Sequence, residues 1–257
     1  MTRTWPVFAL LLAILASSTA FGVPAPVDDS QRYAGCLALA GRDPARAIKA
    51  AEDWRASGAG APARHCLAMA YLAAGHFLRA ARELEALAEA GGASALMRAD
   101  ALAQAGEAWL GGGKPNKAYL DFSAALAETP TGAPARVTRY IDRARALADL
   151  HDYTAALADL EQARAIDPKR AETYVFMASA WRALGELGPA AKAVAKALAI
   201  DPKNVDALLE RGNIRRLEGN DEGARRDWQA LLVLTTEGPA AEAARVNLAV
   251  LAHPASP

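Results

Sequence analysis

The sequence predicts an all-α fold, a solenoid of about six stacked helical hairpins closed by one further helix. Two observations lead to this prediction. The word AIDPK occurs at 165–169 and again at 199–203, an interval of 34 residues, and a fixed interval of this size indicates stacked supersecondary units. Alanine is abundant while aromatic residues make up only 6% of the chain, and this composition favours helices that pack closely.

Small and large residues recur at matching places in the two copies. A small residue allows two paired helices to cross closely, a larger one fills the wedge between units, and a proline ends the second helix because it has no backbone N–H to donate. A plain helical bundle would not need the same residue class at the same offset. The first copy has Ala156, Leu160, Ala163 and Pro168, and the second has Ala190, Val194, Ala197 and Pro202.

The unit at 171–204 contains the fullest version of this pattern: Tyr174, Met177, Ala178, Trp181, Gly185, Ala190, Val194, Ala197 and Pro202. The set resembles the tetratricopeptide repeat, and the chain as a whole resembles an exported bacterial member of that family. The resemblance implies a right-handed α-solenoid. It also implies that the first helix of each hairpin lines a concave face where extended peptides bind.

The expected units follow one another from residue 28 to residue 238, and the end units are the least regular, as is common where one face has no neighbour. The unit at 28–60 keeps little beyond Gly35, Ala47 and Trp54. The marker alanines of the second helices are spaced by 33, 38, 38, 34 and 34 residues, so longer loops or longer helices are expected near GGAS and TGAPA. The expected units are 28–60, 61–94, 99–132, 137–170, 171–204 and 205–238.

A last helix is expected at 239–252, where Ala241, Ala244, Leu248 and Leu251 fall on one face and can cap the open end of the stack. The repeat region therefore spans 30–252, and 253–257 form a tail.

The first 22 residues predict a secretory signal peptide, with Arg3 ahead of an apolar run and small residues after it. The alternative is an uncleaved membrane anchor, but the run is about half the roughly 20 residues that a bilayer span needs. Residues 23–29 then form a flexible lead-in, and no membrane span is expected after cleavage. The predicted location is the periplasm or the medium.

The two cysteines, Cys36 and Cys66, fall in the first helices of the first two units. An exported chain reaches an oxidising compartment, so an even pair favours a disulfide. Two buried free thiols are the alternative. A metal site is disfavoured because only His65 and His76 lie near enough in the sequence to help.

No catalytic, cofactor or metal site is predicted. The segment GGGK at 111–114 follows a helix and lacks the spacing of a phosphate-binding loop. Lys plus Arg and Asp plus Glu both number 29, so no net field attracts nucleic acid.

Projection of the helical period places five polar residues on the concave side. The arginines among these five residues can bind a partner's carboxylates through paired hydrogen bonds. The alternative is that they are solvated or pair with Glu107, Glu172 and Asp206 of the chain itself. The candidate binding residues are Glu107, Arg145, Arg182, Asn213 and Arg216.

The leading functional hypothesis is a non-catalytic scaffold or adaptor of the bacterial cell envelope that binds a protein or peptide. An accessory factor or enzyme of envelope glycan or peptidoglycan processing is the alternative, and a purely structural role for the convex face is a third. The partner and the oligomeric state stay open.

Overall fold

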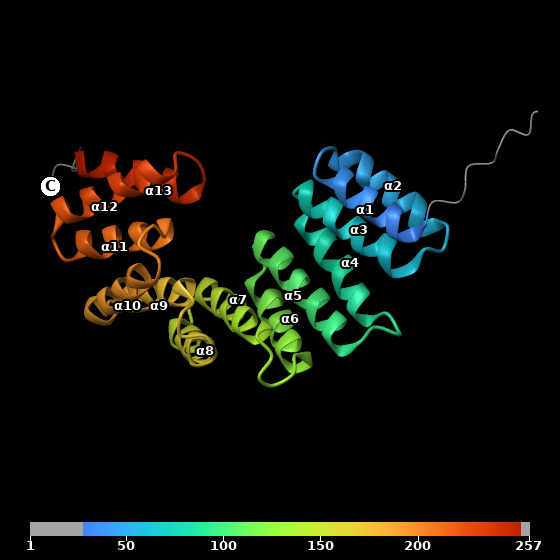
Figure 1. The fold of residues 1–257 in the computed structure, drawn as a ribbon, viewed down its shortest axis with the longest axis horizontal. Helices are drawn as coiled ribbons and strands as arrows, with labels where there is room; N and C mark the ends of the chain where they lie inside the picture. The colour runs from blue at the N-terminus through green and yellow to red at the C-terminus, as the bar shows by residue number, and fades with distance from the viewer. Residues whose placement is uncertain (1–27, 253–257) are drawn as a thin grey trace, which may run out of the picture.

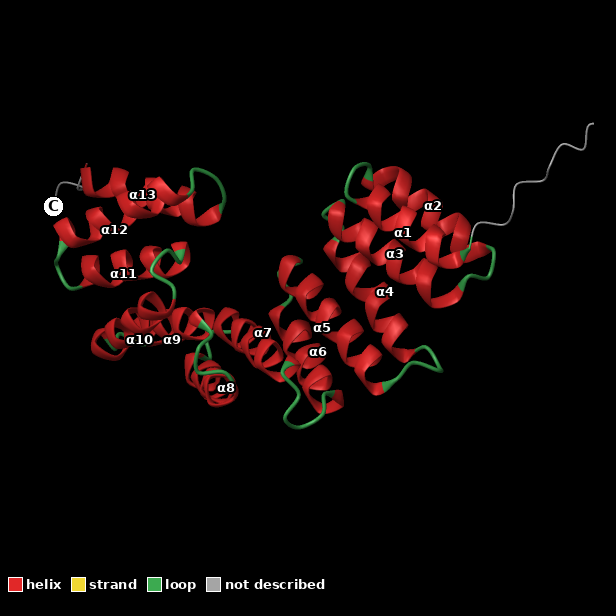
Figure 2. Cartoon of the chain, viewed as in Figure 1, coloured by secondary structure: helices red, strands yellow, loops and turns green. Residues whose placement is uncertain are grey.

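The computed structural model describes residues 28–252, and within them it contains helices and loops only (Figure 2). The predicted signal peptide, most of the lead-in and the tail lie outside the described residues. The helices in this range are α1 (Asp29–Ala40), α2 (Pro44–Ala56), α3 (Gly60–Ala73), α4 (Phe77–Glu89), α5 (Ala95–Gly111), α6 (Pro115–Glu128), α7 (Ala135–Asp149), α8 (Tyr153–Ile166), α9 (Ala171–Ala183), α10 (Leu187–Ile200), α11 (Val205–Leu217), α12 (Asp221–Leu234) and α13 (Pro239–Ala252).

Consecutive helices pack as antiparallel pairs, and the pairs follow one another along a curved path with its two ends on the same side (Figure 1). The first helices of successive pairs also touch, as α5 touches α7 and α9 touches α11. Because neighbouring first helices meet while the second helices lie outside them, the first helices form the concave face. The prediction of an all-α solenoid is confirmed.

The turn inside a hairpin needs a residue with positive φ. Gly185 and Gly219 have φ values of 81° and 79°, and both lie just after a first helix. Glycine adopts this conformation without steric cost. His151 takes the same place in the fourth hairpin with φ 62°, and it is a position where replacement by glycine would relieve backbone strain.

Close packing inside each hairpin depends on small residues facing large ones. A Cβ added at Gly106 would lie 2.5 Å from the Phe122 ring, and Phe122 is fully buried. Gly212 faces the buried Trp228 in the same way. The sequence pattern of small and large residues is therefore a pattern of helix contacts.

Longer helices and longer loops both accommodate the extra residues of the two longer repeat intervals. α5 and α7 have 17 and 15 residues, longer than the other helices, and loops at 90–94 and 129–134 precede them. The buried apolar residues also divide near this point, because one cluster belongs mainly to α1–α6 and another to α7–α13. No helix in 28–252 has the length and apolar character that crossing a bilayer requires.

Candidate functional site

Glu107 and Arg145 lie on the concave face and join the third hairpin to the fourth. Arg145 Nη1 donates to Glu107 Oε1 at 2.5 Å and lies 3.6 Å from Asp142 Oδ1. Asp142 is buried; burial first, and then the charge of Glu107, raise the pKa of Asp142 to about 7. The three side chains form one local network across the seam between α5 and α7.

Further along the same face, Arg182 donates to both carboxylate oxygens of Glu210, at 2.5 and 3.3 Å, and so joins α9 to α11. Asn213 accepts from Asn247 Nδ2 at 2.9 Å, which joins α11 to α13. Arg216 is exposed, and its side chain forms no hydrogen bond or ion pair with any described residue. Four of the five candidate residues therefore connect one unit to the next.

Two of the three candidate arginines pair with acidic residues of the chain itself, which was the alternative to a free binding surface. Arg145 pairs with Glu107 as that alternative states, whereas the partner of Arg182 is Glu210, and Glu172 instead accepts from Arg170. A partner that bound these arginines through carboxylates would have to displace carboxylates of the chain. Arg216 is the one candidate arginine free of such competition among the described residues.

A hollow of about 680 Å³ opens at the other end of the concave face, near the beginnings of α1, α3 and α5. The loop between α4 and α5 covers one side of it. Its walls are mainly apolar, and Met97, whose exposed fraction is 61%, stands at its rim. Apolar walls include Ala61, Pro62, Leu87, Met97 and Ala101.

A chain of three polar side chains crosses the hollow. Tyr33 Oη lies 2.7 Å from His65 Nδ1, and His65 Nε2 lies 2.9 Å from Gln104 Oε1. With the Gln104 amide in this orientation its Oε1 accepts, so His65 donates from Nε2 and accepts the tyrosine proton at Nδ1. The three residues come from α1, α3 and α5. Their separations of 32 and 39 residues are close to the repeat interval, and that was the sequence signal that could have found them.

The disulfide between Cys36 and Cys66 fastens α1 to α3 next to this polar chain, with the two Cα atoms 6.2 Å apart. Both cysteines belong to the buried core. The first helix has only Cys36 and Ala40 among its buried residues, so apolar packing alone holds it weakly. The covalent bond therefore fixes the helix that supplies Tyr33 to the hollow.

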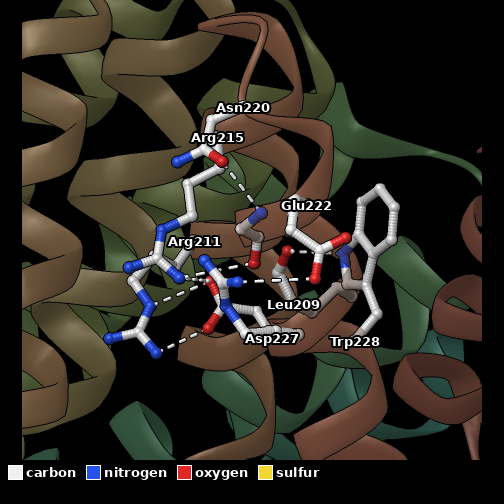
Figure 3. Close-up of polar contacts among 9 residues, drawn as sticks. Leu209, Arg211, Arg215, Asn220, Glu222, Asp227 and Trp228 are labelled. Carbon is white, nitrogen blue, oxygen red and sulfur yellow. Dashed lines mark hydrogen bonds and ion pairs between the residues drawn. The ribbon is translucent and has the colours of Figure 1, made fainter.

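Pairs of a half-buried arginine and a buried aspartate recur inside the hairpins at equivalent positions. Arg143 donates to both oxygens of Asp159 at 2.7 Å. Arg211 does the same to Asp227, and Arg215 adds a third bond at 2.7 Å; both arginines point at this aspartate in Figure 3. Each pair spans 16 residues along the chain. Charge-assisted bidentate bonds of this kind hold the two helices of a hairpin in register.

Asp121 occupies the same position in the third hairpin but has no arginine opposite it. The residue 16 positions before it is Ala105, where the other two hairpins have Arg143 and Arg211. Asp121 Oδ2 is buried and has no hydrogen-bond partner among the described residues. Burial first, and then the charge of Glu85, raise the pKa of Asp121 to about 7.

The described residues contain no group of three or more His, Cys, Asp and Glu side chains placed to hold a metal ion. His76 and His151 lie at turns, as expected, and His253 lies outside the described range. In the GGGK segment, Gly111 ends α5 and residues 112–114 form the turn to α6.

Comparison with known proteins finds a tetratricopeptide repeat in part of the chain. A family model described as tetratricopeptide repeat matches residues 147–211. The solved structure of PilW, described as a widely conserved type IV pilus biogenesis factor, is 19% identical, covers 85% of this chain and 98% of its own, and has a TM-score of 0.66. MamA from Desulfovibrio magneticus RS-1 is 21% identical over 68% of this chain and 94% of its own, with a TM-score of 0.56. No curated protein sequence matches significantly.

Proposed function

We propose that this tetratricopeptide-repeat protein is a non-catalytic adaptor that binds a protein or peptide partner in the hollow of its concave face. One observation carries the proposal. Three first helices and the α4–α5 loop enclose a space of about 680 Å³ whose walls are apolar and whose floor has ordered polar groups. Concave sites with apolar walls and a few oriented polar groups are typical binding sites.

The cell envelope is the proposed location. The signal peptide predicted from the sequence and the disulfide between α1 and α3 both favour an oxidising compartment outside the cytoplasm. The likeness to PilW concerns the fold, because the identity is 19%, and we assign no role in pilus assembly.

The glycan-processing alternative gains no support from the carboxyl pair on the concave face. Arg145 holds both carboxyl groups of this pair, Glu107 and Asp142, whereas the two carboxyl groups of a glycoside hydrolase stand roughly 5–9.5 Å apart with space between them for the scissile bond. The pair is therefore part of the contact between α5 and α7.

Photo-crosslinking in cells tests the proposal. A photoreactive amino acid placed at Met97, at the rim of the hollow, is expected to capture a specific partner. The control is Val233, whose exposed fraction of 86% makes it equally accessible but which lies on the second helix α12, away from the concave face. Adducts from position 233 and none from position 97 would contradict the proposal and favour a convex binding surface.

A further inference from the structure

The charged groups that line the hollow are all acidic. Asp29 and Asp100 belong to its rim, and the lining contains neither lysine nor arginine. Asp29 is exposed and forms no ion pair with a described residue. Asp100 contacts Arg139 through Oδ1 only, and its side chain is 55% exposed, so one oxygen stays available to another donor.

Besides Arg139, which pairs with Asp100, Arg64 and Arg98 adjoin lining residues in the sequence and are engaged elsewhere. Arg98 donates to Glu128 and to the Ala93 carbonyl oxygen, and Arg64 donates to Glu83 on α4. Each of these guanidinium groups therefore has its own acceptors inside the chain, and neither lines the hollow.

The beginnings of three helices also face this region, and helix N-termini ordinarily attract anions. At two of them a side chain already occupies one amide group. Asp28 accepts from the Ser30 amide at the start of α1, and Ser94 accepts from the Met97 amide at the start of α5. The start of α3 has no side-chain cap, but Pro62 removes one of its amide N–H groups. The full charges in the lining are those of the acidic side chains.

From this arrangement we infer that the hollow binds an extended peptide segment in which an apolar side chain stands next to a positive charge. The inference rests on the proposed function and specifies its ligand. The apolar part packs against the Leu87 and Met97 side of the hollow, and the cation lies near Asp29 and Asp100. A lysine or arginine side chain and a free peptide amino terminus share this chemistry. The pairs Arg145–Glu107 and Arg182–Glu210 play no part in it.

Three synthetic peptides test the inference by fluorescence anisotropy with the chain that follows the predicted signal peptide. One is GSLKLSG with both ends blocked, the second is GSLELSG with both ends blocked, and the third is LLSGSG with a free amino terminus. We expect the lysine peptide to bind more tightly than the glutamate peptide by at least about five-fold, because the glutamate adds repulsion to the loss of attraction. Tight binding of the third peptide would identify the amino terminus as the natural source of the charge.

Two substitutions at matched places locate the site. Asp29→Asn removes a rim carboxylate, and Asp221→Asn removes the exposed acidic residue that begins α12 in the same way. Asp29→Asn is expected to weaken the lysine peptide by about two- to five-fold, as for an exposed ion pair, whereas Asp221→Asn leaves its affinity unchanged. Ala61→Trp, at an exposed wall position, is expected to abolish binding.

Equal or tighter binding of the glutamate peptide would overturn the inference, and so would binding that survives Ala61→Trp. Failure of all three peptides would also overturn it, whether the hollow is filled by residues 23–27, by a second copy or by nothing. If crosslinks from position 97 persisted in that case, the adaptor function would stand and only the ligand chemistry would fall.

Discussion

Asp121 and Asp159 occupy the same position in two hairpins, and replacing each by asparagine should change stability in opposite directions. Asp159 accepts two hydrogen bonds at 2.7 Å from Arg143, whereas one oxygen of Asp121 is buried without a partner. Asparagine keeps the shape of the side chain and removes its charge. The Asp121→Asn variant should be more stable than the wild type at pH 8, and the Asp159→Asn variant should be less stable.

The sign for Asp121 follows from its pKa, which burial and Glu85 raise from 3.8 to about 7. A carboxyl whose folded-state pKa is raised favours the folded state when it is protonated, so this contribution is lost as the pH rises from about 4 through 7. One pKa unit corresponds to about 1.4 kcal/mol, so the full shift would amount to about 4 kcal/mol. Because Asp121 is half-buried and water screens its charge, we expect about 1–2 kcal/mol.

Urea unfolding followed by circular dichroism at pH 5 and pH 8 measures both effects. The stability difference between Asp121→Asn and the wild type should shrink as the pH falls towards 4. Asp159→Asn should lose about 3 kcal/mol at pH 8, since it leaves a half-buried guanidinium with one charged partner fewer. If Asp121→Asn were destabilising at pH 8, or equally different from the wild type at both pH values, the explanation based on the missing arginine would be refuted.

Three further changes test other parts of the structure. Gly106→Ala should cost about 1–3 kcal/mol because the new methyl group meets the Phe122 ring, while Gly35→Ala, with open space around it, should not destabilise; equal unfolding midpoints would disprove this packing argument. The double variant Cys36→Ser, Cys66→Ser should lose about 3–4 kcal/mol and speed amide exchange in α1 far more than in α11; uniform exchange would contradict the special dependence of α1 on the disulfide. Glu107→Gln should change the free energy of unfolding by less than about 1 kcal/mol, since its bond with Arg145 is partly exposed. A loss several times larger in thermal unfolding would mean that the contact between α5 and α7 depends on this bond more than its exposure suggests.

The fold was predictable because the repeat interval, the small residues and the terminal prolines each reflect a local physical requirement. Pro168 and Pro202 stand just after α8 and α10, as expected of residues that cannot continue a helix. The disulfide was predictable from the number and position of the cysteines. All four features can be recognised within one or two neighbouring units.

The candidate site was only partly predictable because its contacts depend on which residues meet across a seam. The concave arginines were identified, but Arg182 meets Glu210, 28 residues further along, and this choice depends on how α9 and α11 are packed. His65 gains its role from Tyr33 and Gln104, one unit away on either side. The sequence shows that Asp121 lacks an arginine partner only when Ala105 is aligned with Arg143 and Arg211.

Hydrogen exchange measured by mass spectrometry on the chain that follows the predicted signal peptide, with and without the lysine peptide, locates the binding site. If the hollow at the start of α1, α3 and α5 is the binding site, added protection will concentrate at 29–40, 60–73 and 90–104. Protection confined to α9, α11 and α13, or to the outer helices, would contradict binding in the hollow.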